Sequence, residues 1–75
     1  MARQVLDVIG EVCPVPLILA KERMQSLDAG DELVILTDFT RTVRNVIDWA
    51  DAMGYHLTVA EEEGGVWRIT VRKER

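Results

Sequence analysis

The sequence holds few of the residues that build disulfides, metal sites or stacking platforms. It has one cysteine, one histidine and four aromatic residues among 75. One cysteine cannot form an internal disulfide, and one cysteine with one histidine cannot supply the roughly four ligands of a structural zinc site. Four aromatic residues give little material for stacking nucleic-acid bases. The thiol of Cys13 is therefore either packing material or a chemical reagent.

Long apolar runs and an excess of positive charge are also missing. No run approaches the about 20 residues that span a bilayer, and the first residues lead directly into a strand-like pattern rather than a signal sequence. The net charge of −4, from nine basic and thirteen acidic residues, disfavours non-specific binding to nucleic acid and to anionic membranes. We expect a cytoplasmic protein that is not membrane-embedded, has no stable nucleic-acid binding, and works with protein or small-molecule partners.

The length sets the scale of the fold. A chain of 75 residues allows one domain, which we assign to residues 1–75, with a core too small to enclose a deep active site. We therefore expect any chemistry to take place at a loop or helix end near the surface, with the substrate held partly by another protein.

The apolar residues follow strand and helix periods in turn. The predicted elements are a strand over 5–9, a helix that ends near 29–30, a strand over 33–36, a helix over 40–53 begun by Asp38 or Thr40 as N-cap, and a hairpin of strands 56–61 and 66–72. A helix between sequential strands normally joins parallel neighbours. The sequence thus predicts an α+β fold of order β-α-β-α-β-β, a two-layer α/β sandwich in which both helices cover one face of a four-stranded mixed sheet.

Cys13 lies at the predicted start of the first helix and is followed by two prolines at alternate positions. Pro14 disfavours the helical conformation for the residue before it, so we expect Cys13 to be extended and to act as N-cap. Pro16 falls within the first turn, where a missing N–H is tolerated. The donors left near the sulfur are the amides of Val15 and Leu17, which can face a thiolate or a persulfide.

The positive end of the helix dipole favours the thiolate. It is worth about 0.3 to 1 kcal/mol at exposed sites and ~2 kcal/mol in favourable geometry, so it should lower the pKa of the Cys13 thiol moderately below its ordinary value. A lone cysteine is more often a buried small hydrophobe. The flanking prolines favour a functional thiol, because a packing residue needs no rigid helix start.

The segment Gly10 to Pro16, with its Cys-Pro-x-Pro element, an amphipathic helix, Gly30, an apolar strand and Asp38, closely resembles the TusA/SirA-like family of sulfur carriers. The resemblance extends over essentially the whole chain. It implies a sandwich like the C-terminal domain of translation initiation factor 3, a persulfide carried on Cys13, no cofactor, and sulfur-donor and sulfur-acceptor proteins as partners, a transporter or a sulfur-relay complex among them.

Two positions depart from members that relay sulfur toward tRNA thiolation. Val12 replaces a basic residue before the cysteine, and Phe39 follows Asp38 where those members have proline. The segment 37–46 looks more like a branch associated with uptake of sulfur compounds, in some of which a second cysteine follows the aspartate. Any resolving thiol would then come from a partner.

Several other polar and aromatic residues have two interpretations. Asp38 is either a helix cap or a support for the Cys13 loop. Arg41 and Arg44 could contact an anionic sulfur donor or a partner, although Arg44 and Asp48 also have the spacing of a helix-surface ion pair.

For the remaining candidates the plain interpretation is favoured. His56 is expected at the surface, residues 61–63 at a solvated hairpin tip, and Trp49 and Trp67 as half-buried anchors. Trp49 with Arg68 and Arg72 is kept as a possible docking border.

The function predicted from these residues and the resemblance is that of a sulfur carrier or sulfurtransferase, in thiosulfate-type sulfur use or thiolation. The alternative is a non-catalytic adaptor or regulatory module on the same fold. A peroxide-sensing thiol is less favoured, because the chain has no second cysteine to resolve it.

Overall fold

The described residues form four strands and two α-helices in the predicted order, β-α-β-α-β-β. The computed structural model describes residues 3–11 and 15–74. Its elements, with a short 3-10 helix in the last hairpin, are β1 (Arg3–Asp7), α1 (Val15–Gln25), β2 (Glu32–Thr37), α2 (Thr40–Met53), β3 (His56–Glu61), η1 (Glu63–Gly65) and β4 (Trp67–Arg72).

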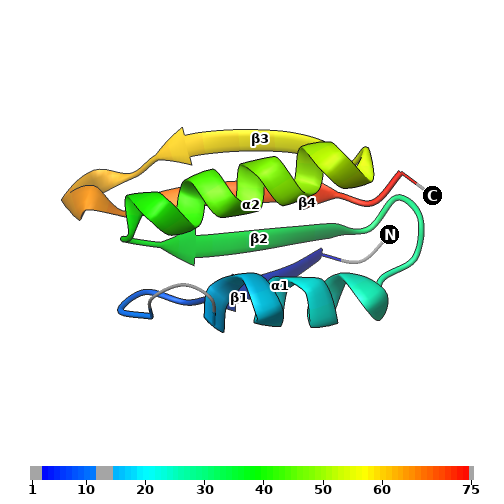
Figure 1. Ribbon diagram of the computed structural model, residues 1–75, viewed down its shortest axis with the longest axis horizontal. Helices are drawn as coiled ribbons and strands as arrows, with labels where there is room; N and C mark the ends of the chain where they lie inside the picture. The colour runs from blue at the N-terminus through cyan, green and yellow to red at the C-terminus, as the bar shows by residue number, and fades with distance from the viewer. Residues whose placement is uncertain (1–2, 12–14, 75) are drawn as a thin grey trace.

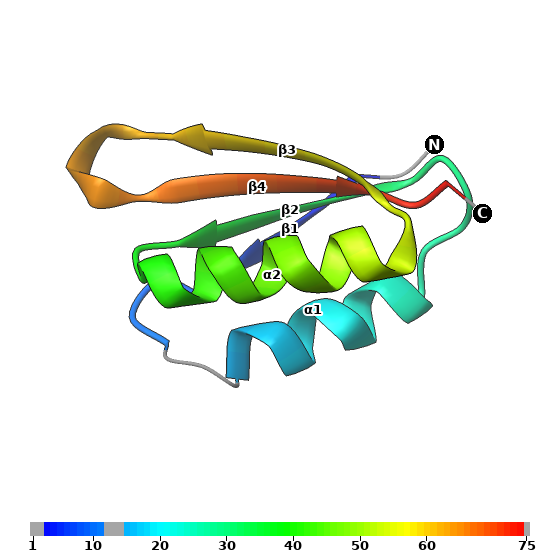
Figure 2. The same cartoon turned by 45° about the horizontal axis from the view of Figure 1, so that its top comes forward.

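The strands form one mixed sheet in the order β1-β2-β4-β3. β1 pairs with β2 in parallel, and β4 pairs antiparallel with both β2 and β3. Both helices cover the same face of this sheet (Figures 1 and 2). The predicted α+β two-layer sandwich is therefore confirmed.

The connection from β2 through α2 to β3 does not join neighbouring strands, although sequential strands joined by a helix are expected to be neighbours. β2 and β3 are parallel, but β4 lies between them. The residues of the two inner faces account for the order: β4 has Trp67, Ile69 and Val71 there, whereas the paired positions of β3 are Glu61, Val59 and Leu57. In the folded sheet Ile69 and Val71 are fully buried, and Val59 is 36% exposed. A central strand is covered more completely than an edge strand, so the more apolar inner face of β4 occupies the centre.

The core lies between the sheet and the helices. β2 contributes Leu33 and Ile35 to this core. Val34 lies between them in sequence and is buried on the opposite face of the sheet. Burial on both faces confirms the predicted central position of β2. The buried core residues of the other elements are Leu6, Val8, Ala20, Met24, Leu27, Val43, Val46, Ala50, Ile69 and Val71. Within residues 3–11 and 15–74, neither α-helix has the length and apolar character needed to cross a bilayer.

The two helices end in different ways. α2 ends at Met53, as predicted, and Gly54 adopts the left-handed conformation (φ 75°) that only glycine takes without strain. α1 ends at Gln25, about four residues before the predicted stop near Gly30. The ammonium of Lys73 donates to the carbonyls of Met24 and Leu27 at 3.0 and 2.8 Å. A distant residue thus satisfies carbonyls at this helix end, and no local signal reports it.

Candidate functional site

The carboxyl ends of the two parallel strands meet at one end of the molecule. Since α1 and α2 follow β1 and β2 in sequence, the N-termini of both helices begin beside the same sheet end (Figures 1 and 2). In open α/β sheets, ligands bind outside the carboxyl ends of parallel strands. This end of the fold, where helix dipoles present their positive poles, is the candidate site.

A tight turn follows β1 on the way to this site. The amide of Val8 donates to Leu36 of β2 at 2.9 Å, so the pairing extends one residue beyond the strand. The amide of Ile9 then donates to the Asp7 carboxylate at 3.0 Å. Gly10 has φ 87°, a conformation that side chains other than glycine rarely adopt. The turn closes where the amide of Glu11 donates to the Val8 carbonyl at 3.0 Å.

Asp38 connects this turn to the junction of β2 and α2. Its Oδ1 accepts a hydrogen bond from the amide of Gly10 at 3.0 Å, across 28 positions of sequence. The prediction that Asp38 or Thr40 caps α2 is wrong, because the N-cap is Phe39 and no side chain caps the helix. The Asp38 carboxylate is instead bonded to the Gly10 turn, and the Thr37 hydroxyl accepts from the amide of Phe39 at 3.2 Å.

The candidate nucleophile falls between two described segments. Val12, Cys13 and Pro14 lie outside the described residues, so the predicted extended conformation of Cys13 and the role of Pro14 stay predictions. The chain is described again from Val15, the first residue of α1.

The first turn of α1 contains the other three predicted support residues. The amides of Val15 and Leu17 lie where the helix itself supplies no acceptor. Val15 is exposed and Leu17 half-buried, while Pro16 is fully buried. Pro16 therefore also packs in the interior, a role that its place in the sequence does not signal.

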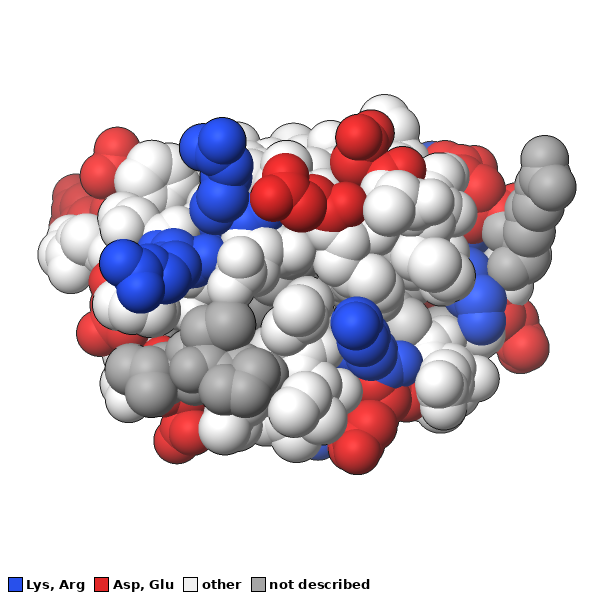
Figure 3. Space-filling model, in the orientation of Figure 1, with Lys and Arg blue, Asp and Glu red and all other residues white. Residues whose placement is uncertain are grey.

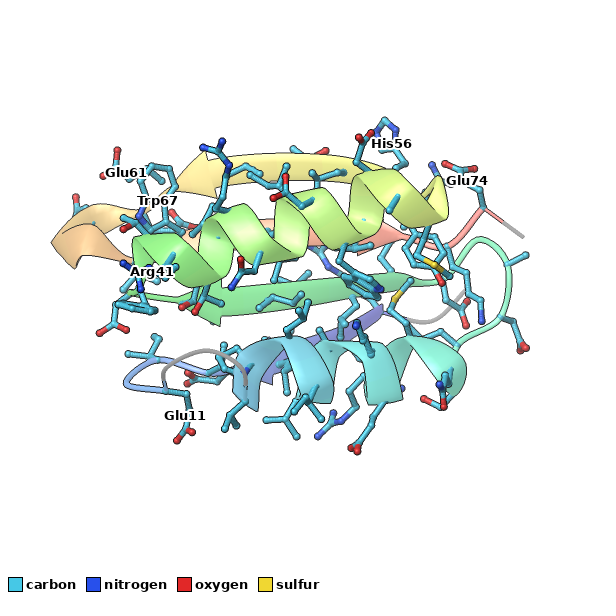
Figure 4. The ribbon with its side chains drawn as sticks, in the orientation of Figure 1. Glu11, Arg41, His56, Glu61, Trp67 and Glu74 are labelled. Atoms are coloured by element: carbon cyan, nitrogen blue, oxygen red, sulfur yellow. The ribbon has the colours of Figure 1, made fainter. Side chains whose placement is uncertain are left out.

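Arg41 and Arg44 lie on the first turns of α2, and both are exposed. The alternative in which Arg44 pairs with Asp48 is not found, since the ion pair within the described residues joins Arg68 to Glu62. Figure 4 shows Arg41 at the same end of the molecule as Glu11, whose side chain extends away from α2. No carboxylate of the described chain neutralises either guanidinium.

The remaining candidates are separate from this site. His56 is exposed at the start of β3. Trp49 is half-buried and forms an edge-to-face contact with Tyr55, their ring centroids 5.6 Å apart. Arg68 and Arg72 alternate with the buried Ile69 and Val71, so they point to the other face of the sheet. A docking border of Trp49 with these two arginines is therefore ruled out.

A solved crystal structure has the same fold as this chain. A crystal structure of a SirA-like protein from Desulfitobacterium hafniense superposes with a TM-score of 0.89 at 32% identity, over 96% of this chain and 99% of that one. The fold is thus that of the SirA-like proteins.

Similarity of sequence gives the family. Residues 4–73 match the family model described as Sulfurtransferase TusA, and the chain belongs to this family. TsuB of Escherichia coli, named as a candidate sulfur carrier, is 42% identical over 69 residues, which is 91% of this chain and 92% of that protein. MJ0990 of Methanocaldococcus jannaschii, named in the same way, is 34% identical over 73 residues, 97% of each chain. These relations support a role for the chain as a sulfur carrier.

Proposed function

We propose that Cys13 accepts a sulfane sulfur atom as a persulfide and relays it to an acceptor protein in sulfur trafficking. The observation that carries the proposal is the place of the only cysteine in the sequence, between the Gly10 turn, which is bonded to Asp38, and the first turn of α1. The N-termini of α1 and α2 both lie at this end of the sheet, and a helix N-terminus favours negative charge on a nearby sulfur.

The reaction balances without an added oxidant or reductant. The Cys13 thiolate attacks the outer sulfur of a donor persulfide; the new S–S bond forms as the donor S–S bond breaks, and the donor leaves as a thiolate. With a thiosulfonate donor, the leaving group is a sulfinate. An acceptor thiolate then attacks the outer sulfur of the Cys13 persulfide. A new S–S bond forms on the acceptor as the S–S bond to Cys13 breaks, and Cys13 leaves as a thiolate. Amides of Val15 and Leu17 would stabilise the negative sulfur at each stage, and Arg41 and Arg44 would contact an anionic donor or the partner.

Mass spectrometry of the intact protein tests this proposal. After incubation with inorganic polysulfide, the chain should gain one sulfur atom, which a reductant removes. The gain should pass to a small thiol acceptor in a second incubation. A chain that stays unmodified under donor conditions that load a reference thiol would contradict the proposal.

The hydrogen bond from Gly10 to Asp38 provides a sharper prediction about the support of this site. Asp38→Ala removes the acceptor, so the turn before Cys13 is no longer tied to α2, and misplacement of a reacting group slows a transfer step. We expect the sulfur-transfer rate to fall about tenfold, equivalent to ~1.4 kcal/mol of activation free energy. Single-turnover transfer to an acceptor thiol measures it.

Two control variants separate the hydrogen bond from the charge. Asp38→Asn keeps an acceptor oxygen and loses the charge, so it should transfer at nearly the wild-type rate. Asp48→Ala removes an exposed carboxylate farther along α2 and should have no effect. Equal slowing in Asp38→Asn and Asp38→Ala would show that the charge, rather than the tie to Gly10, is what matters.

A further inference from the structure

A groove lies between α2 and the β3–β4 hairpin, on the side of α2 that faces away from α1. Its volume is about 320 Å³, and it is lined by Thr40, Val43, Arg44, Ile47, Val59 and Trp67. We name it the α2–hairpin groove. Figure 4 shows Trp67 at the end of the molecule where α2 begins, near Arg41.

The groove exists because α2 covers the half of the sheet formed by β3 and β4 incompletely. Most residues of β3 are exposed, and Val59 on its inner face is 36% exposed. Ile47 and Trp67 are packed against the core but only partly buried. The floor is therefore apolar and large enough to accept a side chain from another molecule.

The charges at this groove are opposite in sign to those of the chain as a whole. Arg44 lines it and Arg41 lies one turn earlier, and neither forms an ion pair within residues 3–11 and 15–74. Figure 3 shows two basic side chains together over the first half of α2, with acidic side chains over its second half. Glu61, paired across the strands with Trp67, places one negative charge at this same end of the groove (Figure 4). The net charge of the chain is −4, so this positive patch is local.

We propose that the α2–hairpin groove docks a segment of a protein partner in which an apolar side chain is flanked by carboxylates. The apolar side chain would fill the space between Ile47 and Trp67, and a carboxylate would pair with Arg44. The groove begins at Thr40, two residues from Asp38 and its bond to Gly10. A partner docked there would reach the edge of the candidate site. That this partner is a sulfur donor or acceptor rests on the proposed function. That an acidic segment docks in the groove does not depend on the proposed function.

A second copy of the chain fits this groove less well. In a two-fold symmetric dimer the same patch meets itself, so the guanidinium groups of the two copies would lie close together. Juxtaposed like charges disfavour such a contact. The occupant is therefore assigned as a different, acidic protein.

The test uses Trp67 as its own reporter. Trp49→Phe removes the other tryptophan, which lines a separate groove between the two helices, so the fluorescence comes from Trp67. The probe is a blocked synthetic peptide of sequence Glu-Asp-Leu-Leu-Asp-Glu. We expect saturable binding with a blue shift of the emission, weakened by salt. Peptides with lysines in place of the acids, or glycines in place of the leucines, should bind at least about tenfold more weakly.

Matched variants locate the binding. Arg44→Glu should weaken binding at least about tenfold, since it replaces attraction by repulsion. Arg3→Glu makes the same charge change on β1, at an exposed position of the far edge strand, and should leave binding unchanged. Val59→Ser, at a partly exposed position, should also weaken binding and keeps the result interpretable if Arg44→Glu perturbs the fold.

Three results would overturn the assignment. These are no binding of the acidic peptide at millimolar concentration, equal binding of the basic peptide, or a dimer in sedimentation that Arg44→Glu dissociates. Sulfur loading of the wild-type chain by polysulfide is measured separately. Peptide binding without loading would refute the proposed function alone, and loading without peptide binding would refute the docking alone.

Discussion

Replacing Cys13 with serine should abolish sulfur loading completely. Serine keeps the size of the side chain and an oxygen that can cap a helix, but its hydroxyl cannot form a persulfide. The other sulfur atoms of the chain belong to three methionines, whose thioethers have no proton to lose. Intact-mass measurement after polysulfide treatment should therefore show an unmodified chain, with a circular dichroism spectrum and melting temperature like those of the wild type.

A cysteine moved to the opposite end of α1 is the matched control. Ser26 is exposed just beyond Gln25, and its hydroxyl donates to the carbonyl of Arg23 at 2.8 Å. The double variant Cys13→Ser with Ser26→Cys has the same composition, but its thiol lies at the negative end of the helix dipole. It should load sulfur slowly and transfer it poorly to a protein acceptor. Transfer at the wild-type rate would show that the position of the thiol is irrelevant. Full biological activity of Cys13→Ser would favour the adaptor function instead.

The largest effect on stability is expected from Ile69→Ala. Ile69 is fully buried on β4 and pairs with Ile35 on β2 and Val59 on β3. Truncating a fully buried isoleucine to alanine costs about 2 to 5 kcal/mol, because apolar burial is lost and a cavity remains. A chain of this length has roughly 4 to 11 kcal/mol of stability in total. We therefore expect the variant to lose a large fraction of its free energy of unfolding, as measured by urea denaturation.

Ile18→Ala makes the same chemical change where no cavity can form. Ile18 lies on α1 and is 50% exposed, and alanine is the better helix former. Its free energy of unfolding should differ from that of the wild type by less than about 0.5 kcal/mol. If Ile18→Ala were as damaging as Ile69→Ala, the division into core and surface described here would be wrong.

Local patterns predicted the elements well because each has a strong signal of its own. The α2 bounds agree because apolar residues recur along one face up to Met53 and Gly54 follows. The alternation of Trp67, Ile69 and Val71 predicted the inner face of β4. The order of the strands was less accessible, since it depends on which strand of the hairpin is better covered by α2. Whether β3 or β4 occupies the central position depends on contacts with α2 and β2, and neither strand's own pattern reports those contacts.

Long-range contacts account for what the sequence left open at the site. Asp38 had two interpretations, and the choice between them depends on Gly10, 28 positions away. Carbonyls at the end of α1 are bonded by Lys73, which follows the last strand. The α2–hairpin groove combines residues from α2, β3 and β4, and no local motif marks it. Only the resemblance around Cys13 predicted the role of the chain, because the Cys-Pro-x-Pro element is contiguous in sequence.

The pH dependence of Cys13 alkylation shows directly whether the start of α1 favours negative charge on this sulfur. The rate with iodoacetamide should be measured across the pH range in the native chain and in the same chain unfolded in urea. We expect the midpoint of the native chain to lie below that of the unfolded chain, with ready reaction near neutral pH. A native thiol that titrates at or above the unfolded value, or that reacts slowly at every pH, would contradict it.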